Sequence, residues 1–111
     1  MNIAARLLAL FFLTAGGVAT ACAQDARPEN WSAVKCERYS KAWREALTRL
    51  GTRGLGQEFL DRHETFLASR CEGPHDVCPR SAEELKLANI MVVRAMNAGT
   101  ASTFPPFGCA N

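Results

Sequence analysis

The sequence lacks the charge imbalance that would indicate a nucleic-acid or membrane-surface protein. Its 13 lysines and arginines nearly balance 11 aspartates and glutamates. Removing residues 1–23, in which Arg6 is the only charged residue, leaves 12 basic against 11 acidic residues, a formal charge of +1. So small a net charge provides no basic footprint for nucleic acid or for an anionic membrane. At 111 residues, the chain has room for one small domain.

Motifs for metal binding and for thiol redox chemistry are also missing. No Cys-x-x-Cys pair occurs, and the closest cysteines of the domain, Cys71 and Cys78, are seven positions apart. His63-Glu64 begins like the helical zinc-protease motif, but Leu67 stands where the second histidine must lie on the same helix face. There is no internal repeat and no strand-like alternation. The sequence therefore predicts no metal site, no cofactor and no sheet.

Residues 1–23 have the three-part pattern of a secretory signal peptide. A short start containing Arg6 precedes an apolar run from Leu7 to Val18, and small residues follow from Ala19 to Ala23. The run is shorter than the roughly 20 apolar residues of a membrane-spanning helix. We therefore expect export, with residues 24–30 as a short polar linker and residues 31–111 as the folded domain.

Two processing schemes fit the end of this segment. Residues 21–23, Ala-Cys-Ala, fit the small-x-small rule of the general signal peptidase, which would discard Cys22 and release a soluble periplasmic protein. Residues 19–22 also resemble a bacterial lipobox, although Ala19 stands where leucine is usual, and lipidation of Cys22 would anchor the protein to a membrane. We prefer the soluble form, and in both schemes an even number of cysteines remains for disulfides.

Apolar residues at steps of three and four predict two helices joined by a glycine-containing turn. The first runs from a capping Ser32 to Leu50, before Gly51. The second follows Gly54 and ends before Gly73-Pro74. The predicted buried positions of the two helices are Cys36, Tyr39, Trp43, Leu47 and Leu50, and then Leu55, Phe59, His63, Phe66, Leu67 and Cys71.

A third helix is predicted from Ser81 to Gly99. Ser81 and Glu84 have the capping-box spacing, in which each side chain satisfies an amide of the first turn. The expected core face of this helix is Leu85, Ala88, Val92, Ala95 and Met96, with Met91 beside it. The fold class is thus all-α: a helical hairpin, a third helix and an extended C-terminal tail.

The four remaining cysteines allow three pairings, and helix geometry favours one of them. Cys36 and Cys71 stand at matching distances from the turn, so an antiparallel helix pair brings them together. Residues 100–109 can extend to about 33 Å, which exceeds the ~27 Å length of the third helix and lets Cys109 reach Cys78. Each bridge would stabilise the domain by about 3.5 to 4 kcal/mol in the chain-entropy model. Structural disulfides are more consistent with the spacing than redox-active ones.

The tail and the first tryptophan offer two interpretations. Residues 104–107, Phe-Pro-Pro-Phe, form either a lid over the helices or an exposed edge presented to a partner. Trp31 likewise either packs on the first turn or lies exposed. Trp31, Phe104, Pro105, Pro106 and Phe107 are therefore the candidate partner-binding residues.

Catalysis is not expected from this sequence. His63 is a nominal base, and Ser69, Ser81 and Ser102 are nominal nucleophiles, but no nucleophile elbow surrounds any of these serines. We also expect three short helices to leave little concavity for a pocket of ~300 Å³ or more. A small secreted hydrolase using His63 is the less favoured alternative.

Together these features predict an exported, non-catalytic protein of the bacterial envelope that binds another envelope or secreted protein. In layout it resembles small disulfide-tied periplasmic proteins such as secretion-system immunity proteins or acid-stress chaperones, although it carries no diagnostic motif of either. The other alternative is a lipid-anchored structural component attached through Cys22, which is the only scheme that brings the protein to a membrane.

Overall fold

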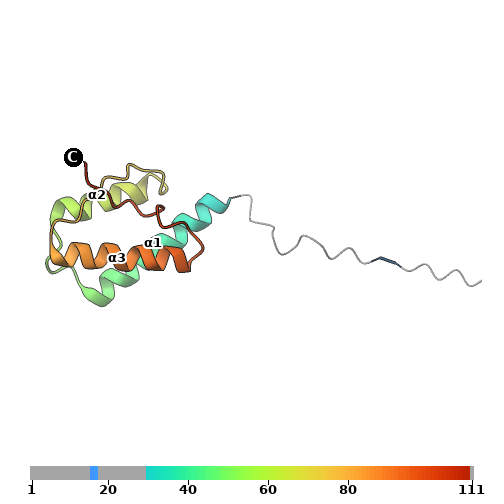
Figure 1. Ribbon diagram of the computed structural model, residues 1–111, viewed down its shortest axis with the longest axis horizontal. Helices are drawn as coiled ribbons and strands as arrows, with labels where there is room; N and C mark the ends of the chain where they lie inside the picture. The colour runs from blue at the N-terminus through green and yellow to red at the C-terminus, as the bar shows by residue number, and fades with distance from the viewer. Residues whose placement is uncertain (1–15, 18–29, 111) are drawn as a thin grey trace, which may run out of the picture.

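The computed structural model describes residues 16–17 and 30–110 and shows three α-helices (Figure 1). They are α1 (Trp31–Leu50), α2 (Gln57–Ala68) and α3 (Ala82–Asn97). Between residues 30 and 110 no strand forms, and the nearest approach to one is an isolated bridge between Val77 and Phe107. The all-α prediction is confirmed. The predicted signal peptide, the predicted linker up to Glu29 and the proposed lipidation site Cys22 lie outside the described residues, apart from Gly16 and Gly17.

The first helix begins one residue before the predicted cap. Asn30 occupies the N-cap position, its side chain makes no capping hydrogen bond, and its carbonyl accepts from the amide of Val34 at 3.1 Å. Ser32 therefore lies inside the first turn, and the prediction that it caps the helix is wrong. Trp31, the first residue of the helix, lies beside Gly99 at the end of α3. The predicted end at Gly51 is confirmed, because its φ of 75° is one that glycine adopts readily.

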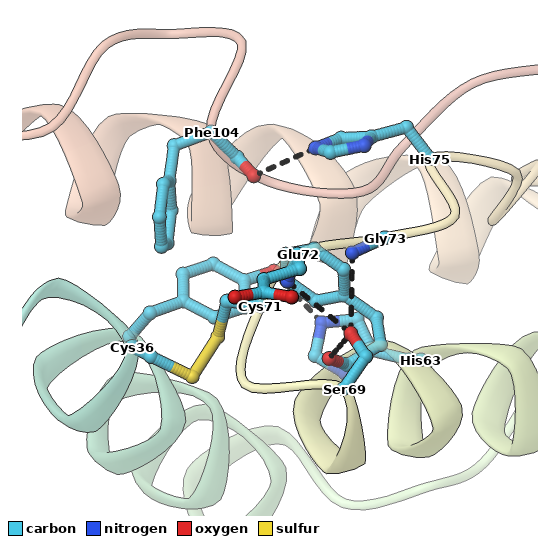
Figure 2. Close-up of a disulfide and its surroundings, with 10 residues drawn as sticks. Cys36, His63, Ser69, Cys71, Glu72, Gly73, His75 and Phe104 are labelled. Carbon is cyan, nitrogen blue, oxygen red and sulfur yellow. Dashed lines mark hydrogen bonds between the residues drawn. A yellow bond between two sulfur atoms is a disulfide. The ribbon is translucent and has the colours of Figure 1, made fainter. Parts of the chain in front are cut away.

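The second helix is shorter than its apolar pattern suggested. It begins after Gly56, and after Ala68 the chain passes through Arg70 and Cys71, both with a φ of 60°. The Ser69 hydroxyl stabilises this reversal (Figure 2). It donates to the Phe66 carbonyl at 2.6 Å and accepts from the amides of Glu72 at 3.2 Å and Gly73 at 3.1 Å. Cys71 therefore lies in a turn rather than in the helix.

Ser81 caps the third helix as predicted, but only one of the two hydrogen bonds of the predicted capping box forms. The amide of Glu84 donates to the Ser81 hydroxyl at 3.0 Å. The Glu84 carboxylate does not return to Ser81. It accepts from the amides of Arg80 and Gly56, each at 3.0 Å, and so joins the start of α3 to the start of α2. Glu84 is 5% exposed, which makes it a buried charge with two charge-assisted hydrogen bonds.

The predicted core face of α3 is correct at Ala88 and Ala95 and wrong at Leu85 and Met96, so the true face is rotated from it by most of a quarter turn. Leu85 is 54% exposed and Met96 is 51% exposed, whereas Leu87 and Met91 are buried. Two long-range bonds set this rotation. Glu84 is held at α2, and Arg94 donates to the carbonyl of Ala42 in α1 at 2.9 Å. The core face of α3 is therefore Glu84, Leu87, Ala88, Met91 and Ala95.

The core is aromatic and lies where the three helices and the tail meet. Of the helices, α1 and α3 pack most closely. Aromatic rings of α1 and α2 meet each other, and Val77 of the following loop is also fully buried. The buried apolar cluster comprises Cys36, Tyr39, Trp43, Ala46, Phe59, Phe66, Cys71, Val77, Leu87, Met91 and Ala95.

Both predicted disulfides are present. Cys36–Cys71 joins α1 to the turn after α2, with 5.5 Å between Cα atoms. Cys78–Cys109 joins the loop before α3 to the tail, with 4.6 Å between Cα atoms. The tail returns along the domain as predicted, and beside the second bridge it is paired to the loop: Val77 donates to Pro106 at 3.0 Å, and Gly108 donates to Val77 at 3.1 Å. Two disulfides in one small domain are typical of an oxidising, exported environment.

Candidate functional site

The solvent-facing side of α3 carries a line of large apolar side chains. Leu85, Val93 and Met96 are 54%, 57% and 51% exposed. At about 100° per residue these three positions fall within one quarter of the helix circumference, with the exposed Asn89 among them and the half-buried Val92 at their border. We call Leu85, Val93 and Met96 the apolar face of α3. Single exposed apolar residues are ordinary on protein surfaces, but a line of three along one helix is typical of a contact surface.

Trp31 lies close to one end of this face. Gly99 follows Met96 by one turn, and a Cβ placed at Gly99 would lie 3.6 Å from the Trp31 ring. Arg38 covers the same ring at 5.3 Å from its centroid and donates to the Ala98 carbonyl at 3.2 Å. Trp31 is therefore half-buried against the end of α3. Neither of the two interpretations, packing on the first turn or lying exposed, describes this arrangement, because the end of α3 and Arg38 cover part of the Trp31 ring.

The tail residues pack inward. Pro105 and Pro106 are buried, and Phe104 and Phe107 are partly buried against the core cluster. The Phe107 ring stacks on the Phe59 ring, with 6.0 Å between centroids, and on the His63 ring, with 5.8 Å between centroids. Figure 2 shows the Phe104 ring pointing from the tail toward the Cys36–Cys71 bridge. This packing supports the lid interpretation of residues 104–107.

His63 lies at the centre of the aromatic core and is fully buried. Its imidazole stacks on the indole of Trp43, and its Nε2 is 2.7 Å from the hydroxyl of Tyr39. Burial lowers the pKa of His63 from 6.5 to about 3 and raises the pKa of Tyr39 well above its ordinary value. At neutral pH, His63 is therefore an uncharged imidazole beside a protonated phenol.

The second ring nitrogen of His63, Nδ1, is buried without a hydrogen-bond partner within residues 30–110. No serine or carboxylate hydrogen-bonds to His63 in that region. Ser69 is occupied by the turn after α2, and Ser81 caps α3. Within residues 30–110, the only hydrogen-bond partner of His63 is Tyr39, and the imidazole is closed off from solvent, whereas a hydrolytic base needs a nucleophile and access to substrate.

A cleft opens at the start of α2, where sequence reasoning expected little concavity. Its volume is about 390 Å³, so that expectation is wrong. The cleft forms because the tail and the loop before α3 stand beside the first turn of α2. Its lining residues are Gly56, Gln57, Glu58, Phe59, Arg62, Asp76, Cys78, Arg80, Glu84 and Ala110.

Most charges around the cleft are already paired. Arg62 bonds Glu58 at 3.1 Å and Asp76 at 2.7 Å, and Glu84 is held by two backbone amides. Arg80 makes no ion pair with any residue that the structure describes. The amide of Gly56 already donates to Glu84, so the protein's own carboxylate stands at the positive end of α2.

No group of three or more His, Cys, Asp or Glu side chains gathers as metal ligands in the described part of the chain. None of α1, α2 and α3 is both long and apolar enough to cross a membrane. The chain matches no protein-family model, no curated protein and no solved structure.

Sequence reasoning missed the apolar face of α3 and the cleft. The sequence did contain a signal for the apolar face of α3. The apolar positions of residues 82–97 cover more of the helix circumference than one core contact requires. Such an excess indicates that part of the arc faces solvent, but not which part. The cleft had no comparable signal, since its walls come from α2, the loop before α3 and the end of the tail.

Proposed function

We propose that this protein is an exported, non-catalytic component of the bacterial envelope, located in the periplasm, that binds another protein through the apolar face of α3. The observation that carries the proposal is the alignment of Leu85, Val93 and Met96, each more than half exposed, on one helix. The two disulfides support an oxidising compartment.

The apolar face supplies a reason for binding in free-energy terms. Full burial of a side chain of this kind contributes about 1.5 to 3 kcal/mol, so covering the exposed half of each of three residues contributes roughly 1 kcal/mol apiece. The same residues are not needed for the core, which α3 fills with Leu87 and Met91 on its other side. The face is therefore free to serve a partner without loss of the fold.

The proposed occupant is an amphipathic helix of another envelope protein. A helix presents apolar side chains at steps of three and four, so it can lie along the row that Leu85, Val93 and Met96 form at steps of eight and three, with Asn89 at the intermediate position. A helix seated on the apolar face of α3 alone would bury far less than the ~800 Å² of surface per partner that a stable complex buries. The partner must therefore also contact residues outside this face. Trp31, beside the C-terminal end of α3, is positioned to contribute to that wider contact.

Site-specific photocrosslinking tests this proposal in the exporting cell. A photoreactive amino acid in place of Asn89, in the middle of the face, should form a crosslink to one protein other than this chain. The same amino acid in place of Thr65, an exposed position of α2, should not. Crosslinks from both positions to the same proteins, or only to a second copy of the chain, would overturn the proposal.

A pair of matched variants identifies the residues responsible. Leu85→Gln combined with Met96→Gln should abolish the Asn89 crosslink. Leu50→Gln removes a large apolar side chain that is 45% exposed at the end of α1, and it should leave the crosslink intact. Melting temperatures of the variants check that the fold is unchanged. A crosslink retained by the double variant would rule out this face as the binding surface.

A further inference from the structure

The two disulfides differ in their exposure to solvent. Cys36 and Cys71 are only 9% and 8% exposed, and the ring of Phe104 points toward them from the tail (Figure 2). Cys109 is exposed and Cys78 is half-buried. Exchange begins when a thiolate reaches one of the two sulfur atoms, so access to solvent is one factor that sets how fast each bridge reacts. An incoming thiol can approach Cys78–Cys109 more readily than Cys36–Cys71.

The exposed bridge also lies at the cleft. Cys78 lines the cavity of about 390 Å³, and so does Ala110, the residue after Cys109. Arg80, two positions beyond Cys78, lines the same cavity and makes no ion pair within residues 30–110. A neighbouring guanidinium stabilises a thiolate and makes it a better leaving group. The cleft thus provides room beside the bridge, and its lining includes the Arg80 guanidinium.

Cys78–Cys109 is also the covalent attachment of the tail. From Gly99 onward the chain contains no helix as far as residue 110, and beside the bridge the tail is held by two backbone hydrogen bonds at Val77. Phe107, the residue before Gly108, stacks on the rings of Phe59 and His63. Opening the bridge leaves the tail held by these hydrogen bonds and by the packing of residues 104–107, which must then offset its chain entropy without the covalent link.

We propose that Cys78–Cys109 is a thiol–disulfide exchange site. Its co-substrate is a protein dithiol: a thiolate with a second thiol beside it. Reduction of this bridge frees the tail, while Cys36–Cys71 keeps α1 joined to the turn after α2.

The exchange has two steps. The thiolate of the partner attacks the sulfur of Cys109, forms a mixed disulfide and expels Cys78 as a thiolate. The second thiol of the partner loses its proton to solvent. The resulting thiolate attacks the partner's first sulfur, the one bonded to Cys109 in the mixed disulfide, and releases Cys109 as a thiolate. Both thiolates then take up protons. Two electrons pass from the partner, which becomes a disulfide, to the bridge, which becomes two thiols.

A first experiment measures which bridge opens. The mature oxidised protein is exposed to limiting dithiothreitol, quenched at intervals with iodoacetamide and analysed by peptide mass spectrometry. Cys78 and Cys109 should be alkylated at least ten times faster than Cys36 and Cys71. Equal rates, or faster labelling of Cys36 and Cys71, would overturn the proposal.

A second experiment tests the protein co-substrate. A thioredoxin in which the second active-site cysteine is replaced by serine traps the mixed disulfide. It should form a covalent complex joined through Cys109, visible on a non-reducing gel and mapped by mass spectrometry. No complex, or a complex through Cys36 or Cys71, would contradict the assignment.

A third experiment tests release of the tail. Chymotrypsin cuts after Phe107 but not after Phe104, which precedes a proline. The variant with Cys78→Ser and Cys109→Ser should be cut after Phe107 at least ten times faster than the oxidised wild type, with unchanged helical circular dichroism. If the variant does not fold, the same cleavage is followed during the dithiothreitol time course. Equal cleavage of reduced and oxidised tails would show that the bridge does not hold the tail.

Discussion

The imidazole of His63 stacks on the indole of Trp43, with 3.4 Å between ring centroids and 17° between ring planes. This contact joins α2 to α1 at the centre of the core, where both side chains are fully buried. Burial keeps the imidazole neutral, and within residues 30–110 no carboxylate forms a hydrogen bond or an ion pair with His63 that would stabilise its protonated form. The protonation state of one side chain is therefore coupled to the stability of the whole domain.

Acid should destabilise this protein through His63. Burial lowers the pKa of His63 from 6.5 to about 3, so the unfolded chain binds a proton that the folded protein excludes. The resulting stability is fully present above pH 6.5 and is lost as pH falls toward 3. At one proton per molecule the loss is about 1.4 kcal/mol per pH unit, or roughly 2 kcal/mol at pH 5. Urea denaturation at pH 7.5 and pH 5.0 measures it.

Two substitutions identify the histidine responsible. His63→Phe retains an aromatic ring against Trp43. Its free energy of unfolding should therefore lose most of the decrease that the wild type shows between pH 7.5 and pH 5.0. His75→Gln removes the other histidine, which is exposed, and should leave the pH dependence as in the wild type. A His63→Phe protein with the full wild-type pH dependence would assign the effect to other groups.

Tyr39→Phe should destabilise the domain by about 1 to 3 kcal/mol, the cost of leaving a buried polar group unsatisfied. The substitution removes the only hydrogen bond of the imidazole found within residues 30–110, at 2.7 Å, and leaves both ring nitrogens unsatisfied. The change in the free energy of unfolding from urea titration measures the effect. A change under about 0.5 kcal/mol would mean that the hydroxyl contributes little net stability in the core.

Glu84→Gln should lower the free energy of unfolding by about 1.5 to 3 kcal/mol, because hydrogen bonds to a charged carboxylate are stronger than those to a neutral amide. The two bonds affected are partly buried, and they come from the amides of Gly56 and Arg80. Glu84 is the side chain that ties the first turn of α3 to Gly56 at the start of α2. The matched control is Glu83→Gln, at an exposed position of the same turn, which should change stability by less than about 0.5 kcal/mol. Equal effects of the two substitutions would show that helix charge, rather than the link to Gly56, is responsible.

Cys36→Ser and Cys71→Ser should lower stability by similar amounts, about 3 to 4 kcal/mol each, because both open the same loop. Thermal unfolding of the two single variants measures this under identical conditions. Reduction of both bridges in the wild type should lower the melting temperature further, since it also opens Cys78–Cys109. A large difference between the two single variants, with both folded, would point to a role for one cysteine beyond the bridge.

The sequence by itself determined the number of helices, the end of α1 at Gly51 and the start of α3 after Ser81, and it favoured one disulfide pairing of the three possible ones. These features follow from local rules: periodic apolar residues, the Ser81 cap, the stop at Gly51 and chain lengths that allow Cys36 to meet Cys71 and Cys109 to meet Cys78. It also contained an accurate list of buried aromatic residues in α1 and α2, because Tyr39, Trp43, Phe59, His63 and Phe66 recur at helical spacing. Local spacing did not reveal that Ser32 lies inside α1, because Asn30 occupies the N-cap position.

Only the tertiary structure decided which side of α3 faces the core. The apolar arc of α3 is wider than one contact, and its rotation is set by Glu84 reaching Gly56 and Arg94 reaching Ala42, partners 28 and 52 residues away. The same holds for the cleft and for the exposure of Cys109, because each depends on segments that meet only in the folded chain. Periodicity describes what a helix can bury, and contacts between distant residues select what it does bury.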